Sequence, residues 1–127
     1  MQATVLVFLG AGLGGALRHG VNLGCARLCG LAFPWGTLVV NVAGSLLMGL
    51  IVGWLAQRAN GGAGQSLRLF LTTGLLGGFT TFSAFSLDSW LLWQRGEAAA
   101  AAAYVGGSVA LSVGALALGL FVMRTWA

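Results

Sequence analysis

Long apolar stretches separated by short polar ones dominate the sequence. Four stretches approach the about 20 residues that an α-helix needs to cross the hydrocarbon core of a bilayer. They cover residues 3–22, 34–56, 67–93 and 98–123. The segments between them are too short for a soluble domain. The pattern therefore predicts an all-α membrane protein with four transmembrane helices per subunit, in a single transmembrane domain over residues 1–127.

The third stretch departs from a regular transmembrane helix near its middle, in the sequence LTTGLLGGFTTFSAFS. Gly77 and Gly78 lose much backbone entropy in a helix, and Thr80 and Thr81 are β-branched with hydroxyls that compete for backbone groups. We therefore predict a break in this helix near residues 77–81. Backbone groups freed in hydrocarbon must be buried in protein or line a cavity, where carbonyls suit a cation and a helix N-terminus suits an anion. The break thus predicts an ion site.

Polar side chains recur at helical spacing on two other stretches. They are Thr37, Asn41, Gly44 and Met48 on the second stretch, and Tyr104, Ser108 and Ser112 on the fourth. Stripes of this kind line a wet space or join helices by hydrogen bonds. Phenylalanines follow the break at positions 79, 82 and 85. Their positive ring edges can stabilise a small anion, although such stripes also form apolar cores.

Composition and charge sharpen this picture. The chain is 58% hydrophobic and 6% charged, against about 25% charged in soluble domains. With an even number of spans, Arg58, Arg68 and Arg124 fall on one side of the membrane. The other side holds Arg27 and Arg95, plus Arg18 if its long stem snorkels outward. This balance gives no orientation by the positive-inside rule. We hypothesise insertion in both orientations and an antiparallel homodimer; a single orientation fixed by other features is the alternative.

Small residues and cysteines point to packing. The pairs Gly10 and Gly14, Gly49 and Gly53, and Gly74 and Gly78 have the spacing of small-xxx-small motifs, which allow helices to approach closely in lipid. Cys25 and Cys29 lie one helical turn apart and do not complete a four-ligand zinc site, so a packing role is expected for both.

Two segments resemble a known family. PWGTLVVNVAGSLLMG, from Pro34 to Gly49, and TTGLLGGFTTFSAFS, from Thr72 to Ser86, closely resemble the fluoride channels of the Fluc/CrcB family, as does GGALRH near the end of the first span. Length, span number and balanced charge agree along essentially the whole chain. The resemblance implies an antiparallel, dual-topology homodimer with two fluoride pores in a bacterial-type inner (plasma) membrane. Passive, selective export of F⁻ that relieves fluoride toxicity, without catalysis, is the implied function.

The resemblance also implies residues for the fluoride path. They are Asn41, Thr81, Phe82, Ser83, Phe85, Tyr104, Ser108 and Ser112. Asn41 is expected to offer its side-chain amide, and Phe82 and Phe85 to present ring edges. Arg18 is expected in a vestibule, where its charge would concentrate anions.

A structural Na⁺ at the dimer centre is implied as well. Gly77 and Thr80 of both subunits are its expected ligands, through backbone carbonyls. Two residues depart from the family pattern: Ala84 stands where threonine is usual and Asp88 where glutamate is usual. The shorter side chain of Asp88 leaves its packing or hydrogen-bond partner open.

Other classes of protein make different demands on the sequence. A small proton-coupled multidrug-type exporter shares four spans and an antiparallel dimer, but it needs a membrane carboxylate, for which Asp88 is the candidate. An intramembrane enzyme needs a nucleophilic or metal constellation, which the spacing of residues does not suggest. A structural assembly subunit explains the glycines but not the polar stripes. The expected partners are fluoride, a second copy of the chain and lipid, with no nucleic acid.

Overall fold

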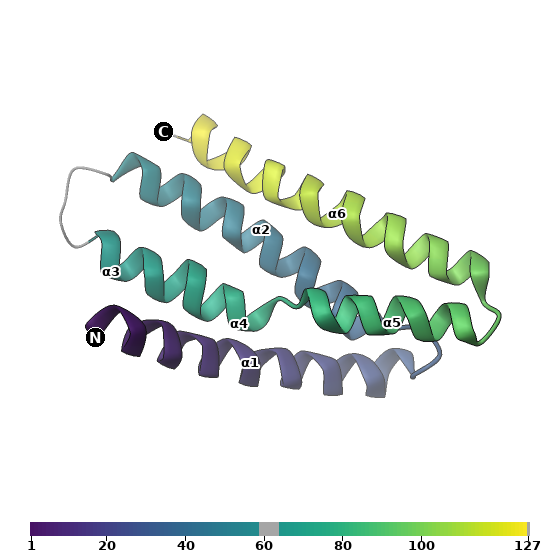
Figure 1. Cartoon of the computed structure of the whole chain (residues 1–127). Helices are drawn as coiled ribbons and strands as arrows, with labels where there is room; N and C mark the ends of the chain where they lie inside the picture. The colour runs from purple at the N-terminus through teal and green to yellow at the C-terminus, as the bar shows by residue number, and fades with distance from the viewer. Residues whose placement is uncertain (59–63, 127) are drawn as a thin grey trace.

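The computed structural model describes residues 1–58 and 64–126, and it consists of four long helical units (Figure 1). Three of the units are the continuous helices α1 (Gln2–Cys29), α2 (Trp35–Gln57) and α6 (Ala98–Thr125). The other unit contains α3 (Gly64–Arg68), the π-helical segment η1 (Leu69–Leu76), α4 (Gly77–Phe79) and α5 (Phe82–Gln94). All four units are long and apolar enough to span a membrane. This confirms the predicted all-α membrane architecture.

The helix ends differ in part from the expected spans. The first span was expected to end at residue 22, but α1 continues to Cys29, where Arg27 in the last turn suits the negative end of the helix dipole. Gly30, with φ of 80°, then ends the helix. The alanine run at 98–103 opens α6, as predicted. Of the second expected connection, residues 59–63 lie outside the described residues, and α3 already begins at Gly64.

The third unit is interrupted at two threonines. Thr80 and Thr81 have extended backbone conformations, with ψ of 159° and 119°, and α5 begins directly after them. The predicted break is thus confirmed, although Gly77 and Gly78 are themselves helical. The preceding turns are wound as a π-helix, with the Gly77 N–H donating to the carbonyl of Thr72, five residues earlier. The residue pattern does not predict this winding, which is rare and frequently found at functional sites.

Glycines bring the helices together at backbone distance. A Cβ atom added to Gly10 would lie 2.7 Å from the carbonyl oxygen of Phe70 on η1, and one added to Gly119 would lie 2.6 Å from that of Leu46 on α2. α1 therefore packs on η1, and α6 packs on α2, with no room for a side chain at these positions. The expected role of the small residues in close helix packing is confirmed at these contacts.

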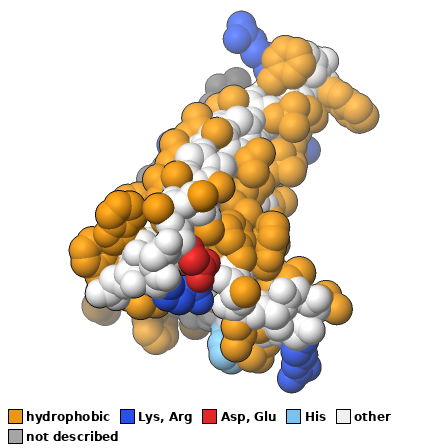
Figure 2. Space-filling model, turned by 90° about the vertical axis from the view of Figure 1, so that its right-hand side faces the viewer, with side chains coloured by type: hydrophobic (Ala, Val, Ile, Leu, Met, Phe, Trp, Pro, Cys, Tyr) orange, Lys and Arg blue, Asp and Glu red, His pale blue; other side chains and the backbone are white. Residues whose placement is uncertain are grey.

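Hydrophobic side chains cover most of the outer surface. Figure 2 looks onto the end of the bundle drawn at the right of Figure 1 and shows hydrophobic side chains over much of the visible face, with a few charged side chains among them. Many large apolar residues are exposed, among them Phe8, Leu13 and Phe121. In water such a surface would aggregate, whereas acyl chains solvate it. The fully buried side chains are few, and Val40, Leu92 and Tyr104 are the largest of them.

Candidate functional site

Asn41 braces the helix break from the neighbouring helix α2. Its side-chain Nδ2 donates to the backbone carbonyl of Thr81 at 3.0 Å, and its Oδ1 accepts from the backbone N–H of Thr81 at 2.8 Å. One side chain therefore satisfies both backbone groups of the residue at the break. Without it, the Thr81 N–H would lack a partner at membrane depth, where an unsatisfied group costs several kcal/mol.

The threonine side chains complete the local hydrogen bonding. Thr81 is the N-cap of α5, and its Oγ1 accepts from the backbone N–H of Ala84 at 3.2 Å. The same hydroxyl lies 3.2 Å from the Oγ of Ser83. Thr80 donates from its Oγ1 to the carbonyl of Leu76 at 2.9 Å, which ends the preceding helical segment. The break is thus held in one defined conformation, with the positive N-terminal end of α5 beside it.

We expect Thr81→Val to destabilise the folded protein by about 1 kcal/mol, because valine has the same shape but no oxygen to cap α5. Thr81→Ser, which keeps the hydroxyl, should restore most of this stability. Thermal unfolding of the two variants in detergent measures the difference. If valine and serine were equally stable, the hydroxyl would not act as a cap.

A cavity of about 350 Å³ lies beside the break, and we call it the break cavity. It is lined by Asn41, Gly44, Ser45, Met48, Thr80, Thr81, Phe82, Phe85, Ser108, Val109, Ser112, Val113 and Leu116. The side chain of Ser108 is 5% exposed, and its Oγ finds no hydrogen-bond partner among the described residues. A buried hydroxyl without a partner is costly, so this group is available to a ligand in the cavity.

Aromatic rings form a connected row along one side of the break cavity. The ring centroids of Phe82 and Phe85 are 5.5 Å apart, and those of Phe85 and Tyr104 are 5.4 Å apart. Phe82 is 78% exposed, whereas Tyr104 is 1% exposed. Phe79, the first phenylalanine of the predicted stripe, lies instead against Gly44. The row therefore leads from the surface of the chain to its most buried aromatic residue.

The structure brings together six of the eight residues implied for the fluoride path. The six that line the break cavity are Asn41, Thr81, Phe82, Phe85, Ser108 and Ser112. Ser83 and Tyr104 are not among the lining residues. Ser83 instead contacts the hydroxyl of Thr81, and Tyr104 donates its hydroxyl to Oδ2 of Asp88 at 3.1 Å. Asp88 thus has a hydrogen-bond partner that the sequence left open.

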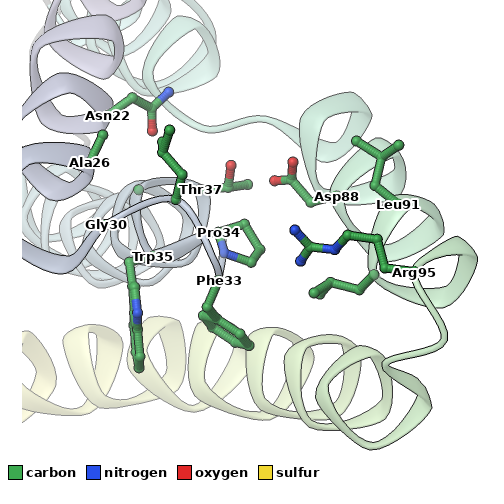
Figure 3. Close-up of a pocket in the computed structure, with 13 residues that line it drawn as sticks. Asn22, Ala26, Gly30, Phe33, Pro34, Trp35, Thr37, Asp88, Leu91 and Arg95 are labelled. Atoms are coloured by element: carbon green, nitrogen blue, oxygen red, sulfur yellow. The ribbon is translucent and has the colours of Figure 1, made fainter.

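A second pocket of about 250 Å³ lies where α1 ends and α2 begins, and we call it the end pocket. Its polar lining consists of Asn22, Thr37, Asp88 and Arg95, and Figure 3 shows these side chains around it. Oδ1 of Asn22 is buried and lacks a hydrogen-bond partner among the described residues. The sequence analysis did not single out Asn22, although an amide within an apolar stretch is a usable signal.

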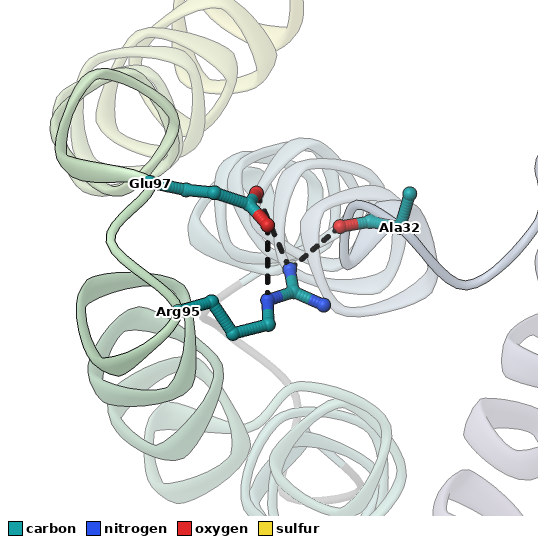
Figure 4. Close-up of polar contacts among 3 residues, drawn as sticks. All are labelled: Ala32, Arg95 and Glu97. Atoms are coloured by element: carbon teal, nitrogen blue, oxygen red, sulfur yellow. Dashed lines mark hydrogen bonds and ion pairs between the residues drawn. The ribbon is translucent and has the colours of Figure 1, made fainter.

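Arg95 is held at the rim of the end pocket by both neighbouring connections. Its Nε forms an ion pair with Oε1 of Glu97 at 3.2 Å, and its Nη2 donates to the carbonyl of Ala32 at 2.7 Å (Figure 4). Ala32 precedes α2 and Glu97 precedes α6. The sequence analysis counted Arg95 only as a charge of one membrane side, and its contact with Ala32 is distant along the chain.

The two carbonyls expected to hold Na⁺ differ in their surroundings. The N–H of Thr81, which would bond to the Gly77 carbonyl in a continuous α-helix, donates to Asn41 instead, so the Gly77 oxygen suits a cation. The Thr80 carbonyl accepts from Nη1 of Arg18 at 3.3 Å and is thus shared with a positive charge. Among the described residues, no three His, Cys, Asp or Glu side chains gather to hold a metal.

Comparison with known proteins gives one consistent result. The family described as "CrcB-like protein, Camphor Resistance (CrcB)" matches the chain over residues 5–120. A protein of Methylobacterium nodulans named "Fluoride-specific ion channel FluC" is 61% identical over 124 residues, which cover 98% of each chain. A protein of the same name from Methylobacterium sp. (strain 4-46) is 57% identical over 124 residues, again 98% of each chain.

Proposed function

The chain belongs to the CrcB-like family, and from this premise we propose that it is a passive fluoride-selective channel that exports F⁻ and so relieves fluoride toxicity. Four candidate spans and the family make it a multi-pass membrane protein, of the plasma membrane in bacteria. The observation that carries the proposal is the hydroxyl of Ser108, which has no hydrogen-bond partner in the described part of the chain and is buried in a cavity beside a helix N-terminus and phenylalanine rings. Each of these groups favours an anion.

The chemistry of the break cavity suits a small anion that must leave as readily as it enters. Fluoride gives up strongly bound water, so it needs donors such as the hydroxyls of Ser108 and Ser112, and positive ring edges of Phe82 and Phe85. None of these groups carries a full positive charge, which would hold fluoride too tightly. Undissociated HF enters a cell from acid surroundings and ionises inside. The membrane potential then drives F⁻ out with about 2.3 kcal/mol per 100 mV.

The proposed assembly is an antiparallel homodimer with two pores and a structural Na⁺ at its centre. Three observations support it: the balanced arginines, the exposed ring of Phe82 and the Gly77 carbonyl freed by the break. Carbonyls of Gly77 and Thr80 from both copies would bind the ion, which supplies positive charge to hold the two breaks together. Arg18 shares the Thr80 carbonyl, so it limits how much of that oxygen a cation can use.

Purified protein in liposomes should release fluoride rapidly and retain chloride. Ion-selective electrodes follow both anions, with a potassium ionophore present to balance the charge. Rapid fluoride loss with chloride retained is the expected result. Liposomes with folded protein that lose neither anion, or lose both at similar rates, would contradict a fluoride-selective channel.

A small proton-coupled exporter is the second candidate, because Asp88 places a carboxylate in the end pocket. Coupled transport requires such a group to bind and release protons. For an exporter, a pH gradient alone should drive substrate uptake into liposomes, and Asp88→Asn should abolish this uptake. A channel should instead carry fluoride down its own gradient with no pH gradient present.

A further inference from the structure

The end pocket lies next to the break cavity along two helices. Thr37 precedes Asn41 by four residues on α2, and Asp88 follows Phe85 by three residues on α5. Residues at these spacings share one face and are about one helical turn apart along the axis. The end pocket is therefore the next space that an anion leaving the break cavity would reach toward this end of the bundle.

An anion in the end pocket would meet an unfavourable charge. Asp88 lines the pocket, and a carboxylate repels fluoride strongly where water is scarce. Arg95 is the one cationic side chain among the lining residues. Figure 3 shows its guanidinium pointing into the pocket toward Asp88. Anions can therefore pass Asp88 only if a positive charge across the pocket offsets its carboxylate, and Arg95 provides that charge.

The contacts of Arg95 fix this charge at the pocket rim. Nε and Nη2 are used by Glu97 and by the carbonyl of Ala32, which leaves Nη1 without a partner among the described residues. The Arg95 side chain is 46% exposed, so the rim is in contact with water. Glu97 is equally open to solvent, with 45% of its side chain exposed, so water screens the two charges of this ion pair to a similar degree.

We propose that the end pocket is a water-filled mouth of the anion path, and that Arg95 is a specificity-determining residue that offsets Asp88 and concentrates small anions there. This inference rests on the proposed fluoride channel function. The polar side chains of Asn22 and Thr37 in the lining would keep the pocket hydrated. Anions would enter or leave through this mouth at a rate that depends on the charge at position 95.

Fluoride efflux at different ionic strengths tests the role of the charge. Arg95→Gln should lower efflux about fivefold at roughly 10 mM salt, the effect of one unit charge at about 4 Å in water. The loss should largely disappear at about 300 mM salt, where charges are screened. Arg95→Lys should restore most of the rate. Arg58→Gln is the control, because Arg58 stacks on Trp54 after α2, far from the start of α2 that lines the pocket.

Two outcomes of this experiment overturn the inference. One is a loss in Arg95→Gln that is equal at both salt concentrations and not restored by lysine, since that would show only a structural role. The other is an unchanged rate at low salt. If wild-type protein releases no fluoride at all, the proposed function fails, and the reactivity of a cysteine in the pocket decides the inference.

Thiol modification probes the end pocket without any fluoride flux. Ala26→Cys, in a chain with Cys25 and Cys29 replaced by serine, places a thiol in the pocket lining. Negatively charged methanethiosulfonate reagents should react with it faster, relative to positively charged ones, when Arg95 is present than in Arg95→Gln. An unreactive thiol, or a ratio that Arg95→Gln leaves unchanged, would overturn a water-filled, anion-attracting mouth.

Discussion

Asn41→Asp should abolish fluoride efflux while leaving a folded protein. Aspartate keeps an oxygen that accepts from the Thr81 N–H, but it loses the Nδ2 donor and places a negative charge beside the Thr81 carbonyl. The same charge lies in the wall of the break cavity, on the proposed path of the anion. At an effective dielectric constant of 20, a charge about 4 Å from fluoride costs about 4 kcal/mol, or nearly a thousandfold in rate.

Two further variants separate the effect of the added charge from the effect of losing the hydrogen bonds between Asn41 and Thr81. Ser66→Asp adds the same charge on α3, outside the break cavity, and should leave efflux near the wild-type rate. Asn41→Ala removes both hydrogen bonds without adding charge, so thermal stability in detergent should fall. Efflux by the folded Asn41→Asp protein at the wild-type rate would remove Asn41 from the anion path.

Among glycine-to-alanine substitutions, Gly14→Ala should lower the unfolding free energy the most. The added Cβ would collide with the carbonyl oxygen of Leu75 and would lie 2.7 Å from the backbone nitrogen of Phe79. Both atoms belong to the backbone, so neither can rotate away, and α1 must separate from η1 and α4. We expect a loss of about 3 kcal/mol in unfolding free energy, at the upper end for overpacked cores.

Gly12→Ala is the matched control for this prediction. A Cβ at Gly12 would have nothing within 4 Å, although the residue lies on the same helix. Alanine favours a helix over glycine by about 1 kcal/mol, so stability should be unchanged or slightly higher. Denaturation of both variants in the same detergent, followed by circular dichroism, gives the comparison. Equal stability of the two would mean that α1 can shift without cost.

The helix break shows how much of the fold local sequence can predict. The two glycines and the two threonines all predicted the break, but only Thr80 and Thr81 have extended backbone conformations. Gly78 is needed for a different reason, because a Cβ there would collide with the backbone of Ala11 on α1. Propensity alone cannot separate these two causes, since a glycine that weakens a helix also permits close packing. The π-helical winding of η1 is likewise not predicted by the local pattern.

Most contacts of the site could not be predicted from the sequence, because the partners lie far apart along the chain. The stripe on α2 identified Asn41 as a polar group at membrane depth. Its partner Thr81 lies 40 residues away, and helical spacing says nothing about contacts between helices. The pairing of Asp88 with Tyr104 and the contact of Arg95 with Ala32 have the same character. Local periodicity identifies which side chains face inward, whereas tertiary packing decides what they bind.

The two hydrogen bonds between Asn41 and the backbone of Thr81 also predict which positions tolerate substitution. Asn41 bonds only to backbone atoms of residue 81, so these two bonds do not depend on which side chain stands at position 81. Proline is the exception, because it has no N–H to donate. At position 41, by contrast, a carboxylate, a hydroxyl or an alkyl group cannot supply both a donor and an acceptor at the same reach. In a library of random variants, position 41 should therefore tolerate far fewer substitutions than position 81, even though the two residues form one contact.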